Sequence, residues 1–85
     1  MIGGELEQMQ SLKASLDRYG SQVGEVAGAI RAQIAATFWK GPAADRFRQA
    51  WSSDFEPALR RLQEALGQAA QEVQRRHDAL QQAGS

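Results

Sequence analysis

The sequence predicts an all-α fold in which two long helices form an antiparallel hairpin, and two such hairpins associate into a four-helix bundle. Apolar residues recur every three or four positions through both halves of the 85-residue chain, which is helical periodicity and not strand alternation. Trp39-Lys40-Gly41 is the clear helix breaker between the halves. Two series repeat every seven residues, as in coiled coils: Met9, Leu16, Val23 and Ile30, and Leu59, Leu66, Val73 and Leu80. We therefore expect one domain over residues 1–85.

The first helix is expected over about residues 5–37. It follows the Gly3-Gly4 pair, so that Glu5 and Glu7 lie in the first turn, where carboxylates interact favourably with the positive end of the helix dipole. Its apolar ladder consists of Leu6, Met9, Leu12, Leu16, Tyr19, Val23, Val26, Ile30, Ile34 and Phe38.

Three glycines recur every four residues inside this helix, at Gly20, Gly24 and Gly28. They indicate either a groove of small residues for close helix approach or a helix weakened by roughly 0.5–1 kcal/mol per glycine and held by packing. The second interpretation is favoured, because successive steps of four drift around the helix and leave Gly28 facing away from the apolar stripe.

A turn is expected over about residues 38–42 and a second helix over 43–82. Gly41-Pro42 suits a helix start, because proline at the first helical position has no amide hydrogen to leave unpaired and its φ is preset. The apolar ladder of this helix consists of Ala44, Phe47, Trp51, Phe55, Leu59, Leu62, Leu66, Ala69, Val73, His77 and Leu80.

Pro57 lies inside the second helix, where proline removes one hydrogen bond and crowds the preceding turn. Ser53 and Glu56 have the spacing of a capping box that restarts a helix. The apolar steps from Phe47 to Leu59 nevertheless keep their phase across this region. We therefore expect a kink near residues 53–57 in an otherwise continuous helix.

Two helices of this length, roughly 50–60 Å each at 1.5 Å per residue, cannot enclose their own apolar stripes. Full burial of one Leu, Val or Phe contributes about 1.5–3 kcal/mol, so a half-exposed ladder would forfeit most of the stability of a small domain. A second hairpin would bury it. The predicted interface comprises Leu12, Leu16, Tyr19, Val23, Val26, Ile30, Ile34, Phe47, Trp51, Phe55, Leu59, Leu62, Leu66 and Val73.

Composition excludes several function classes. Ten basic and ten acidic residues give no net charge that would recruit nucleic acid or an anionic membrane, and the absence of cysteine excludes disulfides and thiolate catalysis. No apolar run approaches the ~20 residues that span a bilayer, and the N-terminal residues do not resemble an ordinary signal peptide. We expect no cofactor, no metal, no nucleic-acid partner and no stable membrane insertion.

Candidate catalytic residues are few, and the chain is not expected to be an enzyme. His77 is the single histidine and occupies a ladder position, so a packing role is favoured over catalysis or metal binding. Asp78 is adjacent in sequence and not on the same helix face. Arg60-Arg61 and Arg75-Arg76 alternate with acidic residues, which is typical of a solvated face with ion pairs four residues apart.

Aromatic residues cluster around the turn. Phe38, Phe47 and Trp51 are readily explained as rings that close the end of a bundle. Trp39 is explained less well in this way, because a tryptophan in a tight turn stays exposed unless something receives it. It is therefore a candidate recognition residue.

The segment from Phe38 to Phe47, FWKGPAADRF, resembles the WXG-motif family of ESX (type VII) secretion substrates, the early-secreted-antigen-like proteins. The resemblance covers essentially the whole chain: a helix, a Trp-x-Gly turn, and a second helix opening with Ala44 and Phe47. A Trp-x-Gly alone carries no information, but its place between two heptad helices is fairly specific.

The resemblance implies a helical hairpin that dimerises into a four-helix bundle and leaves the cell folded, without a cleaved signal peptide. Export would use an ATPase-driven machine of actinobacteria and other Gram-positive bacteria, whose ATPase would be a partner. Trp39 and Gly41 match the family motif. In that family, the turn of one subunit is thought to form a composite export signal with a Tyr-x-x-x-Asp/Glu motif on its partner.

The sequence departs from the family pattern at that C-terminal motif. The single tyrosine, Tyr19, lies in the first helix, and residues 77–81 read His-Asp-Ala-Leu-Gln, with His77 in place of tyrosine and Gln81 in place of the acid. This favours a heterodimer in which the chain contributes the turn and a second Trp-x-Gly hairpin contributes the tail, although a homodimer remains possible.

Three hypotheses follow, of which the first is favoured. The chain is a secreted substrate or export partner in a heterodimer, an adaptor for a larger secreted toxin or effector, or a generic cytoplasmic coiled-coil hairpin. The neighbouring open reading frame separates the first two: a short Trp-x-Gly protein favours the first, and a long chain with a toxin domain favours the second.

Overall fold

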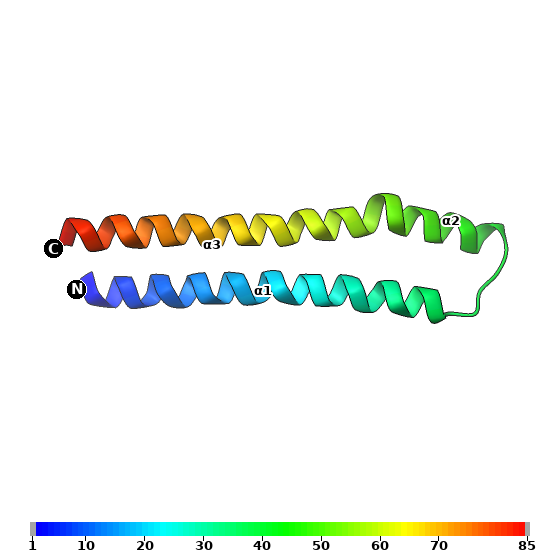
Figure 1. The fold of residues 1–85 in the computed structure, drawn as a ribbon, viewed down its shortest axis with the longest axis horizontal. Coiled ribbons are helices and arrows are strands. Elements are labelled where there is room, and N and C mark those ends of the chain that lie inside the picture. Colours follow the sequence, from blue (N-terminus) through cyan, green and yellow to red (C-terminus); the bar gives the residue numbers. More distant parts are fainter. Residues whose placement is uncertain (1, 85) are drawn as a thin grey trace.

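The computed structural model describes residues 2–84, which form one antiparallel helical hairpin (Figure 1). Helix α1 spans Ile2–Ala36, α2 spans Pro42–Ala50, a π-helical turn η1 spans Trp51–Phe55, and α3 spans Glu56–Gly84. The start of α1 and the end of α3 lie side by side, and the loop between α1 and α2 lies at the far end (Figure 1). The predicted all-α hairpin is confirmed, whereas its pairing with a second hairpin stays a prediction.

The helix ends agree closely with the expected ones except at the start of α1. This helix begins at Ile2, three residues before the expected start, and so includes the glycine pair. The first four amides of any helix lack helical acceptors, so glycines weaken the helix less there than in its middle. The other ends, at Ala36, Pro42 and Gly84, differ by one or two residues, which is within ordinary variation.

The loop of residues 37–41 depends on one glycine. At the end of α1 the Thr37 amide donates to the Ile34 carbonyl at 3.2 Å, and the Thr37 hydroxyl donates to the Gln33 carbonyl at 2.6 Å. Gly41 has φ +117°, which L side chains rarely adopt. Its carbonyl then accepts the first hydrogen bond of α2, from the Asp45 amide at 3.0 Å.

The expected kink takes the form of a π-helical turn. The Glu56 amide donates to the Trp51 carbonyl, five residues back in place of four. Pro57 explains this widening, because its ring crowds the carbonyl of Ser53 and it has no amide hydrogen to donate. The Ser53 hydroxyl donates to the Gln49 carbonyl at 2.8 Å, so no capping box forms. The helix continues through the turn, and its ribbon bows away from α1 here (Figure 1).

The interior of the hairpin is thin and lined by small residues. The buried residues with side chains are Ala27, Ala44, Trp51, Ala70 and His77. Among the described residues no large side chain is fully buried. The molecule measures 64 × 17 × 12 Å, so it is only about one helix thick in its shortest direction.

Contacts between the helices place two of the three glycines against α3. Gly20 is buried, and a β-carbon there would lie 3.6 Å from Leu66 Cβ. At Gly24 it would lie 2.8 Å from Gln63 Nε2. These two glycines therefore line a close approach to α3, whereas Gly28 has no neighbour within 4 Å and faces away as expected.

Candidate functional site

The Trp-x-Gly turn forms the first candidate site. The Trp39 ring packs against Phe47 of α2, with the ring centroids 5.7 Å apart and the planes inclined by 46°. The side chain still keeps 43% of its surface exposed. One face of the indole is therefore supported by the hairpin, and much of the rest is open to a partner.

Arg48 of α2 holds the backbone of this turn. Its Nη1 donates to the Trp39 carbonyl at 2.8 Å, and its Nη2 donates to the Thr37 carbonyl at 3.1 Å. Because Phe47 supports the ring of Trp39 and Arg48 holds its carbonyl, two consecutive residues of α2 fix the tryptophan.

The other aromatic residues near the turn differ widely in their exposure within the single hairpin. Phe38 is 89% exposed, and Lys40 Nζ lies 5.4 Å from the centroid of its ring. Phe47 is 40% exposed, and its ring contacts that of Trp39. Of the three residues expected to close the end of the bundle, Trp51 alone, at 9% exposed, lies in the interior.

Trp51 adjoins the ion pair that connects the two helices. Arg31 Nε of α1 lies 2.7 Å from Glu56 Oε1, and Arg60 Nη2 lies 3.7 Å from Glu56 Oε2. The Arg31 hydrogen bond, followed by the charges of both arginines, lowers the pKa of Glu56, and burial opposes this. The Trp51 indole N–H contributes the smallest lowering of that pKa and makes no hydrogen bond of standard geometry.

The second candidate site is one face of the hairpin, which we call the outer row. It consists of Leu12, Tyr19 and Val26 on α1, Phe55 at the end of η1, and Leu62 on α3. All five are 47–51% exposed and, within each arm of the hairpin, lie seven residues apart. A continuous apolar stripe therefore lies on one side of the hairpin.

The remaining predicted interface residues lie between the two helices. Leu16, Val23, Ile30, Ile34, Leu59, Leu66 and Val73 are half-buried. An apolar groove formed by Tyr19, Val23, Val26 and Leu59, with Gln22 at its edge, joins this inner set to the outer row. Phe55, another predicted interface residue, lies at the end of η1 and belongs to the outer row together with Leu62.

The opposite side of the hairpin is polar. Its groove is lined by Ser21, Gly24, Glu25, Ala27, Arg31, Arg60 and Gln63. The Arg31–Glu56 pair crosses between the helices on this side. The two faces of the hairpin thus differ in chemistry, and the apolar residues collect on one of them.

His77 is a packing residue, as predicted. It is buried to 6% exposure, and its Nδ1 lies 3.1 Å from Asp78 Oδ1. Asp78, although not expected on the same helix face, is therefore within hydrogen-bond distance of the imidazole. Hydrogen bonds from His77 and then Gln74 lower the pKa of Asp78.

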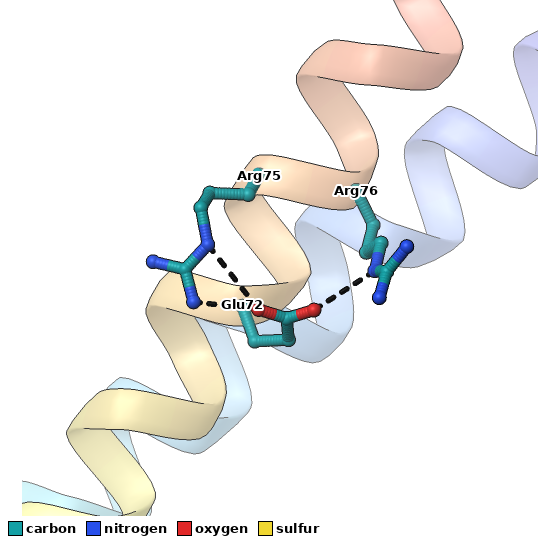
Figure 2. Close-up of polar contacts among 3 residues, drawn as sticks. All are labelled: Glu72, Arg75 and Arg76. Carbon is teal, nitrogen blue, oxygen red and sulfur yellow. Dashed lines mark hydrogen bonds and ion pairs between the residues drawn. The ribbon is translucent and has the colours of Figure 1, made fainter.

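The basic pairs lie on a solvated face. Arg75 and Arg76 both pair with Glu72, and Figure 2 shows the two guanidinium groups directed at its single carboxylate. These hydrogen bonds lower the pKa of Glu72. Of the other pair, Arg60 joins the Glu56 cluster. This arrangement is the ion-paired helix surface expected for these residues.

Neither metal chemistry nor a membrane span has support in the described part of the chain. Residues 2–84 contain no group of three or more His, Asp or Glu side chains that could hold a metal ion. None of the described helices is both long enough and apolar enough to cross a bilayer.

Sequence reasoning missed Arg48, the Arg31–Glu56 pair and two buried alanines. Ala27 fits the three-four spacing between Val23 and Ile30, so the pattern could have identified it. The predicted ladder included Ala69, whereas the buried residue is its neighbour Ala70. No sequence signal marks Arg48, because its acceptors are backbone carbonyls nine and eleven residues earlier.

The family model WXG100, described as proteins of 100 residues with WXG, matches residues 2–85. No curated protein and no solved structure matches the chain. WXG100 proteins are small helical proteins secreted by type VII systems and are not known as enzymes. The match covers nearly the entire chain and includes both helices and the Trp39–Gly41 turn. The chain belongs to the WXG100 family.

Proposed function

We propose that this protein is a substrate or export partner of a type VII secretion system, and that it forms a four-helix bundle with a second Trp-x-Gly hairpin. Its own turn, through Trp39 and Gly41, supplies half of a composite export signal. The outer row carries the proposal, because a half-exposed apolar stripe with heptad spacing is the surface that a second pair of helices covers.

The dimensions of the hairpin support a partner of this shape. A stable domain is built from two packed layers that bury an apolar core between them. The hairpin is 12 Å across its shortest axis and so supplies only one such layer. Its apolar side extends along both helices and its other side is polar, so a partner hairpin would pack on the outer row.

The C-terminal region supports a partner with a different sequence. His77 occupies the place of the family tyrosine, but its side chain is buried and lies against Asp78, so it presents no exposed ring to a secretion ATPase. Gln81 replaces the acidic residue and carries no charge. We therefore assign the tail half of the signal to the partner subunit.

The half-exposed Trp39 is the group that the ATPase would contact on this chain. Trp39 belongs to the loop between α1 and α2, which lies at the end of the hairpin (Figure 1), and it is not part of the outer row, so dimerisation through that row leaves it accessible. The turn and the dimer surface are then separate, and each can be disrupted without the other.

A secretion assay in the native host tests this function. The chain is expressed with the short Trp-x-Gly protein of the neighbouring gene, and its amount is measured in culture filtrate and cell lysate. Wild-type protein should appear in the filtrate only when the partner is present, and Trp39→Ala should remain in the cells as an intact dimer. Export of Trp39→Ala at the wild-type level would refute the proposal. Pairing only with a long toxin-bearing chain would replace it with the adaptor function.

A further inference from the structure

Arg48 joins the second helix to the exit of the first. Its guanidinium group donates to the carbonyls of Trp39 and Thr37 through two different nitrogens. Among the described residues, no other side chain donates a hydrogen bond to the backbone of the loop 37–41. The planar guanidinium group thus bridges two backbone carbonyls that are separated by one residue.

The helix exit needs such a donor. The last carbonyls of α1 lack helical partners, and its last turn contains no basic residue of its own to balance the negative end of the helix dipole. Arg48 supplies a positive charge from the neighbouring helix, and it donates hydrogen bonds to the carbonyls of Thr37 and Trp39 just beyond the end of α1.

The hydrogen bonds of Arg48 restrain the position of Trp39. The loop has only five residues, and Gly41 within it is the one residue with a positive φ, so local backbone preference alone does little to fix the chain there. The indole is supported on one side by Phe47, and its carbonyl is held by Arg48. Without the second attachment the peptide would be free to rotate about Phe38 and carry the ring away from Phe47.

We propose that Arg48 is a positioning residue of the export turn, which holds the loop backbone so that Trp39 presents its exposed face in one orientation. This inference rests on the proposed function, because it assigns a purpose to the turn. It adds a residue outside the Trp-x-Gly tripeptide to the determinants of export. A preformed loop favours recognition because less conformational entropy is lost on binding.

The side-chain chemistry predicts a graded series of variants. Arg48→Ala removes both hydrogen bonds. Arg48→Lys keeps the charge but presents a compact ammonium group in place of a planar fork, so it is expected to hold one carbonyl at a time. Arg46→Ala is the matched control, because Arg46 lies two residues earlier on α2, is exposed and makes no hydrogen bond or ion pair within the described residues.

Loop order is measured first, on the purified full chain with its partner. Nitrogen-15 relaxation of the loop amides and of the Trp39 indole reports their fast motion, and trypsin reports access to the Lys40–Gly41 bond. Arg48→Ala should raise the rate of that cleavage roughly fivefold or more, a population change that the loss of hydrogen bonds can produce. Arg48→Lys should lie between it and the wild type. Thermal unfolding and dimer mass should change little in all variants.

Export is measured on the same series, with Trp39→Ala alongside. The inference expects export to fall in the order wild type, Arg48→Lys, Arg48→Ala, with Arg46→Ala equal to the wild type. If loop motion and the cleavage rate are the same in Arg48→Ala as in the wild type, Arg48 does not hold the loop, whatever happens to export. The same conclusion follows if Arg46→Ala changes both quantities as much as Arg48→Ala does. A loosened loop with normal export of Arg48→Ala, while Trp39→Ala is retained, would overturn its role in export. Normal export of Trp39→Ala would instead refute the proposed function itself.

Discussion

Replacement of the two tryptophans should separate recognition from stability. Trp51 is 9% exposed, and burial of an aromatic side chain removes roughly 150–250 Å² from water. At about 25 cal/mol per Å² this corresponds to ~4–6 kcal/mol, close to the ~3–5 kcal/mol that Trp→Ala substitutions cost in cores. Trp39 keeps 43% of its surface exposed, so the same reasoning gives at most about two thirds as much.

The assay combines thermal unfolding by circular dichroism with a secretion test of each variant. Trp51→Ala should lower the unfolding midpoint further than Trp39→Ala does, and loss of its export should follow from loss of the dimer. Trp39→Ala should leave helicity and dimer mass nearly intact while blocking export. Phe47→Ala should be intermediate in stability, because its ring is 40% exposed but supports Trp39. Equal destabilisation by Trp39→Ala and Trp51→Ala would show that Trp39 is a core residue and refute the reasoning.

Three further outcomes follow from the structure. Leu62→Asp should abolish assembly in sedimentation, because an unpaired carboxylate in an apolar interface costs several kcal/mol. Arg61→Ala should change assembly little, because it removes only an exposed charge. Equal effects of the two variants would mean that the outer row is misassigned. Gly28→Ala should raise stability by about 0.5–1 kcal/mol in denaturant unfolding, since open space surrounds the site, and destabilisation would contradict that placement. The pKa of Glu56 lies below its ordinary 4.5, so its ion pair with Arg31 stabilises the fold above that pH and is lost as the pH falls through the lowered value. The unfolding midpoint should therefore drop on acidification, and less steeply in Glu56→Gln; equal slopes would argue against the pair.

The hairpin could be predicted from sequence because its signals are local and repeated. The three-four spacing of apolar residues fixes which helix faces meet, and Gly41-Pro42 marks the start of the second helix. The heptad residues Met9 to Ile30 and Leu59 to Leu80 do lie towards the opposite helix, half-buried. The same periodicity could not distinguish the inner set from the outer row, because both satisfy it.

The features that sequence could not predict depend on distance in space or on backbone detail. The kink at Pro57 takes the form of a π-helical turn, and a regular helical projection does not anticipate its hydrogen bond from the Glu56 amide to the Trp51 carbonyl. The ion pair of Arg31 with Glu56 can be predicted only when the register of the two helices is known. The hydrogen bonds of Arg48 can be predicted only when the path of the loop backbone is known.

The mass of the purified chain in solution tests the central claim, that one hairpin is half of a bundle. Sedimentation velocity is recorded at micromolar concentration for the chain alone and mixed with the neighbouring Trp-x-Gly protein, beside a thermal melt of each sample. The account predicts a sharply melting dimer in the mixture, and for the chain alone either a homodimer or a poorly folded, aggregating species. A well-folded monomer that melts sharply alone and ignores the second protein would contradict it.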